Sequence, residues 1–191
     1  MTQLFQDPKK TALVVIDLQK GIVAMNSQPY EVQEVVQNNV KLAEALRAKG
    51  GLVTLVHVDF LDGQDALKPV TDASASSSGE RPEGFSEILP ELGPHEGDLV
   101  ITKRQWGAFF GTELDLQLRR RGIDTIILTG IATGIGVDTT AREAFQRNYQ
   151  QIFVQDAMNG ITQEEHEYTV NHVLPKMGRV RTTAEVLDAL K

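Results

Sequence analysis

Short apolar runs alternate with helical patterns along most of this chain. Four runs rich in β-branched residues are predicted as strands: residues 11–17 (TALVVID), 52–58 (LVTLVHV), 125–130 (TIILTG) and 151–156 (QIFVQD). They are apolar almost throughout instead of alternating with polar residues, which is typical of parallel strands covered on both faces. Residues 98–103 and 178–183 are weaker candidates for a fifth and a sixth strand.

Amphipathic patterns between these runs predict helices. In residues 31–49 the apolar positions fall on one face, and Gly50 and Gly51 end the pattern. Further helices are expected from Leu114 to Gly122, at residues 137–148, at 161–174 and at 183–191, the last with Thr183 as N-cap. Strands alternating with helices predict a three-layer α/β/α fold, in which a doubly wound, mainly parallel sheet lies between two helix layers. We expect a single domain over residues 1–191.

One segment fits neither pattern. Residues 62–84 include DASASSSGERPEG, which is too polar to pack as an element and long for a connection. The segment is interpreted either as a lid over a site or as a flexible insertion, and the sequence favours neither.

Composition narrows the class of protein. The chain has 191 residues, 41% hydrophobic and 24% charged, with a formal net charge of -7. The negative charge argues against a nucleic-acid partner, which needs a basic surface. No run approaches the roughly 20 apolar residues of a membrane span, and the polar N-terminus lacks the apolar core of a signal peptide. We therefore expect a soluble cytoplasmic protein without membrane or nucleic-acid partners.

Candidate chemistry gathers where the predicted strands end. In open α/β sheets, ligands bind at the carboxyl ends of the strands. Asp17 ends the first strand, Lys103 ends the run at 98–103, and the turn GIATGIGVD (130–138) follows the strand at 125–130. The alternative interpretation is that Asp17 simply caps the following turn and that Lys103 is a solvated strand end. A carboxylate after a buried strand needs a partner, however, and Lys103 is the cation best placed to supply it.

The glycine-rich turn does not match a known phosphate-binding pattern. Its spacing differs from G-x-G-x-x-G, and no G-x-x-x-x-G-K-[ST] run occurs in the chain. Backbone amides at the start of the following helix can still bind an oxyanion. The four histidines are scattered, with only the His57/Asp59 pair near a strand end, so we predict no metal site and no cofactor.

Three segments of the chain resemble, in their order, the isochorismatase-like (cysteine hydrolase) superfamily. They are TALVVIDLQKGI (11–22), the run from Ile101 to Ala144 that contains ITKRQWG and GIATGIGVD, and VQDAMNG (154–160). The resemblance covers the chain from Thr11 to about Leu174. It implies the same three-layer fold, a hydrolase activity on a small molecule, and a homodimer or higher homo-oligomer.

The resemblance also assigns site residues. Amidase branches of the superfamily have an Asp–Lys–Cys triad; Asp17 and Lys103 match its first two members, and the cysteine position falls on Gly136. The superfamily often has a cis peptide at the position of the Ile131–Ala132 bond, which implies that the Ala132 and Gly136 amides face a substrate oxygen. The chain has no cysteine, so the covalent route is closed. Isochorismatases resemble the chain here: they have glycine at this position and hydrolyse a vinyl ether with the aspartate as proton donor.

These observations predict a hydrolase that acts without a cofactor on a small polar or anionic metabolite. Asp17 is the expected acid/base group, and Lys103 is its charge partner. Burial would raise the pKa of Asp17 and Lys103 would lower it, and the sequence does not decide between them. Trp106, Phe109, Phe110 and Ile131 are the expected pocket residues, although aromatic side chains fill cores as readily as pockets. The alternative is a catalytically silent member that only binds a small molecule.

Overall fold

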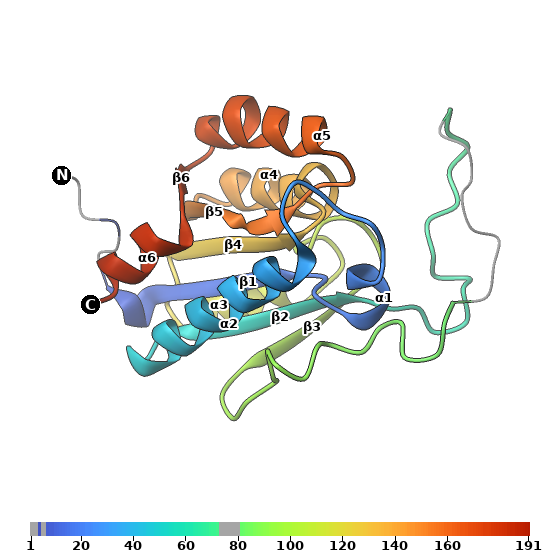
Figure 1. Ribbon diagram of the computed structural model, residues 1–191. Coiled ribbons are helices and arrows are strands. Elements are labelled where there is room, and N and C mark those ends of the chain that lie inside the picture. The colour runs from blue at the N-terminus through green and yellow to red at the C-terminus, as the bar shows by residue number, and fades with distance from the viewer. Residues whose placement is uncertain (1–3, 5–6, 73–80) are drawn as a thin grey trace.

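The computed structural model describes residue 4, residues 7–72 and residues 81–191, and it confirms the three-layer α/β/α fold (Figure 1). Six parallel strands form one sheet in the order β3-β2-β1-β4-β5-β6. Their bounds are β1 Thr11–Ile16, β2 Leu52–Val58, β3 Leu99–Lys103, β4 Thr125–Ile131, β5 Gln150–Asn159 and β6 Arg179–Arg181. The chain leaves β1 toward one side of the sheet and returns to β4 on the other, so these two neighbouring strands form the topological switch point.

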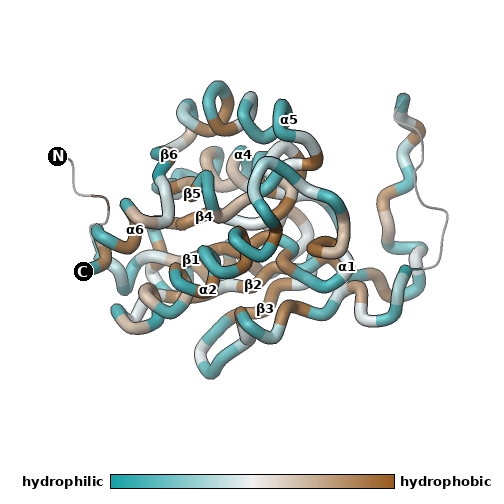
Figure 2. Tube along the Cα trace, in the orientation of Figure 1, coloured by the Kyte–Doolittle hydropathy of each residue, from teal (hydrophilic) through white to brown (hydrophobic). Residues whose placement is uncertain are grey.

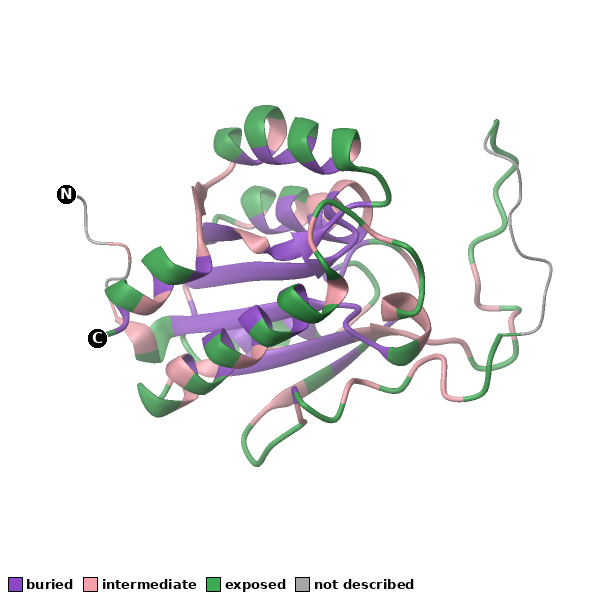
Figure 3. Cartoon of the chain, in the orientation of Figure 1, coloured by how far each residue is buried: buried purple, intermediate pink, exposed green. Residues whose placement is uncertain are grey.

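The central strands are buried on both faces, as their continuous apolar sequences predict (Figure 3). In β1, Val14 and Ile16 belong to one hydrophobic cluster, whereas Leu13 and Val15 belong to the cluster on the opposite face. The sheet therefore has two cores, and each needs a helix layer to cover it.

The helices divide between the two faces of the sheet. They are α1 Lys20–Val23, α2 Val32–Ala48, α3 Leu114–Arg120, α4 Asp138–Gln146, α5 Gln163–Tyr168 and α6 Thr183–Ala189. Apolar residues of α2 and α6 pack in one cluster, and those of α3, α4 and the segment after α5 pack in the other. Apolar residues follow the strands, and the outward surface of α5 is largely hydrophilic (Figure 2).

Two predicted helices differ from the structure. The N-cap of α6 is Thr182, not Thr183, because the Thr182 hydroxyl accepts the Glu185 N–H while the Glu185 carboxylate accepts the Thr182 N–H. The helix predicted at 161–174 is divided into α5, a π turn at Thr169–Val173 and a 3₁₀ turn at Leu174–Lys176, since Pro175 cannot continue an α-helix. A second π turn, Thr133–Val137, precedes α4.

Residues 62–72, the described first part of the polar segment predicted at 62–84, extend away from the sheet beyond the end of β2 (Figure 1). Residues 73–80 lie outside the described residues, so the choice between a lid and an insertion stays a prediction. Among the described residues, no helix combines the length and the apolar composition needed to span a bilayer.

Candidate active site

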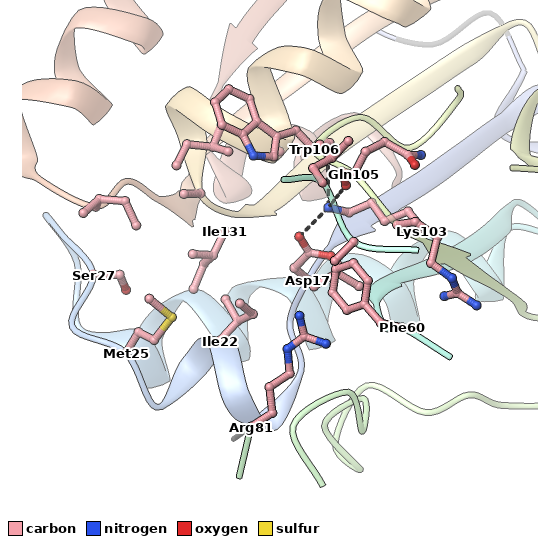
Figure 4. Close-up of a pocket in the computed structure, with 18 of the residues that line it drawn as sticks. Asp17, Ile22, Met25, Ser27, Phe60, Arg81, Lys103, Gln105, Trp106 and Ile131 are labelled. Atoms are coloured by element: carbon pink, nitrogen blue, oxygen red, sulfur yellow. Dashed lines mark hydrogen bonds and ion pairs between the residues drawn. The ribbon is translucent and has the colours of Figure 1, made fainter. Parts of the chain in front are cut away.

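Asp17 and Lys103 form a buried ion pair at the carboxyl edge of the sheet (Figure 4). The Lys103 Nζ lies 2.7 Å from the Asp17 Oδ2. The same Nζ donates to the carbonyl oxygens of Gln105 and Trp106, both at 3.1 Å. An ammonium group has three protons, and these three acceptors use all of them. Lys103 is therefore placed to fix Asp17 and the 105–106 segment, with no proton left to donate to a ligand.

The second oxygen of Asp17 is buried and takes no part in the ion pair. The Asp17 backbone adopts a left-handed conformation (φ 53°), and its N–H donates to the Val56 carbonyl at 2.9 Å. The Oδ1 atom is buried and has no hydrogen-bond partner among the described residues. Burial raises the pKa of Asp17 to about 6, outweighing the positive charge of Lys103, which lowers it. Burial is thus the larger of the two effects, and with this pKa about half of the carboxyl is protonated at pH 6 and about a tenth at pH 7.

The turn after β4 places backbone amides beside this carboxyl. The Ile131–Ala132 peptide is cis, as the resemblance implies. The Ala132 carbonyl accepts the N–H groups of Ile135 and Val137, both at 3.1 Å, whereas the Ala132 N–H makes no hydrogen bond to a described residue. Gly136 is buried, and a Cβ at this position would lie 3.5 Å from the Asp17 Oδ2. The structure therefore brings Asp17, Lys103 and Gly136 together, as predicted from the strand ends.

A cavity of about 600 Å³ opens over these groups. Of the residues expected to line it, Trp106 and Ile131 do so, together with Ala132 and Gly136. Phe109 and Phe110 do not line it.

The two phenylalanines are placed elsewhere by Glu143 of α4. The Glu143 carboxylate accepts the backbone N–H of Phe109 at 3.0 Å and that of Phe110 at 3.3 Å, which holds this segment against α4. Phe109 then points into the core, where its ring lies 5.6 Å from that of Tyr149. The Phe110 side chain points outward and is 70% exposed. The side chains of Phe109 and Phe110 therefore point in different directions, and the contact with Glu143 that causes this cannot be read from the sequence.

Cations around the cavity outnumber acids, which the sequence analysis did not anticipate. Lys68, Arg81, Lys103 and Arg104 line it, and Asp17 is the only acidic residue among the described lining residues. Arg104 is paired with Asp65 at 2.8 Å. The Arg81 guanidinium stacks on the Phe60 ring, 3.9 Å from its centroid, and points toward the side of the cavity that holds Asp17 (Figure 4). The only sequence signal for Arg81 was a lone arginine within a polar segment.

His57, the residue nearest to a metal motif, is engaged in the protein. One ring nitrogen lies 2.8 Å from the Ser86 carbonyl oxygen and the other lies 2.8 Å from the Thr102 hydroxyl. In the described part of the chain, no three His, Asp or Glu side chains come together in a way that could hold a metal ion.

Comparison with known proteins agrees with the geometry. Residues 11–185 match the model of the isochorismatase domain. The chain belongs to the isochorismatase family. Over the whole length of both chains it is 55% identical to an uncharacterised isochorismatase family protein, YwoC, of Bacillus subtilis. An isochorismatase family protein from Burkholderia thailandensis has a solved structure that is 45% identical, with a TM-score of 0.91 over 95% of this chain and 96% of that one.

A more distant relative is named after an enzyme activity. The isochorismatase of Bacillus subtilis is 30% identical over 97% of this chain and 59% of its own length. The solved structure of an N-carbamoylsarcosine amidase from Thermoplasma acidophilum is 30% identical, with a TM-score of 0.73 over 91% of this chain and 96% of that one.

Proposed function

We propose that this family member hydrolyses a small anionic metabolite, with Asp17 as general acid and without a covalent intermediate. The observation that carries the proposal is the buried, unpartnered Asp17 Oδ1 at the cavity, on a carboxyl whose pKa burial raises to about 6. A general acid must hold a proton near the working pH and needs an oxygen that no other group uses; the raised pKa and the unpartnered Oδ1 support this role for Asp17.

Vinyl-ether hydrolysis fits these groups. The Asp17 proton goes to the terminal CH₂ carbon of the vinyl ether, and the C=C electron pair forms the new C–H bond. Water adds to the resulting oxocarbenium carbon, and its proton returns to the Asp17 carboxylate. The hemiketal then breaks its bond to the ether oxygen, and the proton of its hydroxyl group passes to that oxygen, so that an alcohol leaves and a ketone remains. Lys103 stabilises the carboxylate that Asp17 becomes during the reaction, since it already donates to Oδ2 at 2.7 Å.

The cavity also supports the anionic character of the substrate. Arg81 presents a planar guanidinium that suits a carboxylate, and stacking on Phe60 orders it before a ligand arrives. The Ala132 N–H, which makes no hydrogen bond to a described residue, is available to a substrate oxygen. The apolar side chains of Ile22, Trp106 and Ile131 surround the space between these polar groups.

A second function is favoured by the absence of a nucleophile. The chain has no cysteine, and Gly136 offers no reactive group at the position where amidase branches carry one. A binding protein that holds a small anion in the same cavity, without turnover, would need only the cations and amides described above.

Turnover measurements separate the two functions. Isochorismate and other enolpyruvyl ethers would be assayed for pyruvate release, and a panel of small carboxylate-bearing amides for ammonia release. We expect pyruvate release by the wild type and a loss of kcat/KM of about 10²- to 10⁴-fold in Asp17→Asn, as is usual when a general acid is removed. Asp188→Asn, a substitution in a side chain that is 76% exposed, is the matched control and should not change the rate. Binding of these compounds without any turnover would reject the enzyme and support the binding protein.

A further inference from the structure

Glu165 joins two walls of the cavity. It lies in the first turn of α5, and its two carboxylate oxygens accept from different segments. The Gly134 N–H donates to Oε1 at 2.9 Å, and the Ile161 N–H donates to Oε2 at 3.0 Å. Gly134 belongs to the π turn after Ala132, and Ile161 lines the cavity on the side of β5. One side chain thus sets the distance between the turn and the opposite wall.

The fit between Glu165 and the turn leaves no spare room. A Cβ added at Gly134 would lie 2.4 Å from the Glu165 Oε1 and 2.7 Å from its Cγ, well inside contact distance. Glycine at residue 134 therefore allows the carboxylate to reach the backbone N–H. This close approach agrees with the hydrogen bond and shows that the turn is packed directly onto Glu165.

His166 holds the preceding residue of the turn. Its Nδ1 lies 2.8 Å from the hydroxyl of Thr133, and both residues are buried. Burial lowers the pKa of His166, which favours the neutral ring. The edge of the ring packs against Tyr30, with centroids 5.7 Å apart and planes at 87°. Two consecutive residues of α5 thus hold two consecutive residues of the turn.

The contact with Tyr30 extends this arrangement to a third wall. Asn159, at the end of β5, accepts the Tyr30 N–H at 3.0 Å and donates to the Tyr30 carbonyl at 2.8 Å. The same amide donates to the Ser27 hydroxyl at 3.1 Å, and Ser27 lines the cavity. The start of α5 is therefore packed against the segments that carry Ser27, the Ala132 amide and Ile161.

We propose that Glu165 and His166 are positioning residues of the active site, which act by fixing the Thr133–Val137 turn and, through it, the Ala132 and Gly136 amides against the substrate. Glu165 engages the Gly134 N–H, and the Ala132 carbonyl engages those of Ile135 and Val137. These hydrogen bonds hold the turn that follows Ala132, a residue that lines the cavity. The kinetic part of this inference rests on the proposed function; the structural part does not.

The test compares two neighbouring glutamates. Glu165→Ala removes both hydrogen bonds to the turn and to Ile161. Glu164→Ala is the matched control, because it removes the same charge from the same helical turn at an exposed position. Glu165→Gln keeps one acceptor oxygen and the shape of the side chain, so it should retain part of the hydrogen bonding that Glu165→Ala loses. It also provides a testable protein if Glu165→Ala does not fold.

Kinetics distinguish positioning from general stability. Glu165→Ala should lower kcat by about 10- to 100-fold, because amides displaced by a fraction of an ångström no longer meet the developing charge. KM should change less than threefold, Glu165→Gln should lie in between, and Glu164→Ala should match the wild type. A Glu165→Ala enzyme that loses thermal stability but keeps kcat within threefold would overturn the inference.

NMR spectra of the backbone amides test, without a substrate, whether Glu165 fixes the turn. In ¹H–¹⁵N spectra, the Ala132, Gly134 and Gly136 resonances should move in Glu165→Ala and stay in place in Glu164→Ala. If they do not move in Glu165→Ala, the inference fails whatever the enzyme does. If they move but the wild type turns over no compound, the proposed function fails and the role of Glu165 in fixing the turn stands.

Discussion

Gly136 is packed against β1 so closely that a side chain cannot be added without moving Ile16. A Cβ at residue 136 would lie 2.9 Å from the Ile16 Cγ2. Ile16 is fully buried in the central strand and β-branched, so its methyl groups have little freedom to turn aside. Gly136→Ala is therefore expected to overpack the site. Gly136→Cys carries the same Cβ, so simply restoring the family cysteine should meet the same clash.

The size of the effect follows from two opposing terms. Overpacking a buried site costs about 1–3 kcal/mol. Replacing glycine by alanine in a helical turn returns up to about 1 kcal/mol, because the unfolded chain loses freedom. The net loss for Gly136→Ala is then roughly 1 kcal/mol, or about 2–4 °C in Tm for a chain of this length. The clash itself is measured separately by a double-mutant cycle, in which trimming Ile16 makes room for the new methyl group.

Urea unfolding of the four proteins of the cycle is the assay. Ile16→Ala alone should cost about 2–5 kcal/mol as a large-to-small substitution. Added to it, Gly136→Ala should no longer destabilise, which gives a favourable coupling of about 1–3 kcal/mol. Ile16→Val is the matched control, because valine keeps a methyl group in the place of Cγ2 and should give no relief. A coupling below about 0.5 kcal/mol with Ile16→Ala, or equal relief by valine, would refute the steric reasoning.

Three further predictions concern the chemistry of the site. If Asp17 donates a proton from a carboxyl with a pKa of about 6, activity is full below this pH and kcat/KM falls tenfold per pH unit above it; a flat profile from pH 5 to 8 would exclude this role. Lys103→Met removes the charge and the hydrogen bond that lower the pKa of Asp17, so the falling limb of the pH–rate profile should move to higher pH, and a shift to lower pH would contradict the assignment. Arg81→Gln should raise KM for an anionic substrate about tenfold with little change in kcat. Arg120→Gln, at an exposed position of α3, is the control and should have no effect. Equal KM values in the wild type and Arg81→Gln would show that Arg81 does not bind the substrate.

The fold was largely predictable because its information is local. Runs such as 125–130 are apolar on both faces, and this alone indicates a buried parallel strand. Helix ends were less predictable. Thr182 and Thr183 are adjacent and both suit an N-cap, and only the structure shows that the Thr182 hydroxyl accepts the Glu185 N–H. The π turns at 133–137 and 169–173 have no signal of their own, since the same residues would also continue an α-helix.

The candidate site was predictable only where topology determines it. Asp17 follows β1 and Lys103 is the last residue of β3, and neighbouring parallel strands end at the same edge of the sheet. Arg81 and Glu165 lie outside this rule: one reaches the cavity from a long polar segment, and the other acts from a helix through backbone N–H groups. The pKa of Asp17 is likewise a property of the fold, because burial and the charge of Lys103 oppose each other and only the packed structure fixes their balance.

The three glycines of GIATGIGVD are packed against two residues, Ile16 and Glu165, and these contacts explain why none of the positions has a side chain. A Cβ at Gly130 (φ +111°) would lie 2.0 Å from the Ile16 carbonyl oxygen, at Gly134 it would strike Glu165, and at Gly136 it would strike the Ile16 Cγ2. The turn is therefore not a loop with spare room for a phosphate, nor a nucleophile site from which one side chain has merely been deleted. The space beside Asp17 is already filled by β1, so a single reverse substitution should not restore thiol chemistry. Since the chain has no cysteine and Lys103 has no proton to spare, the group left to exchange a proton with a ligand at this edge of the sheet is Asp17.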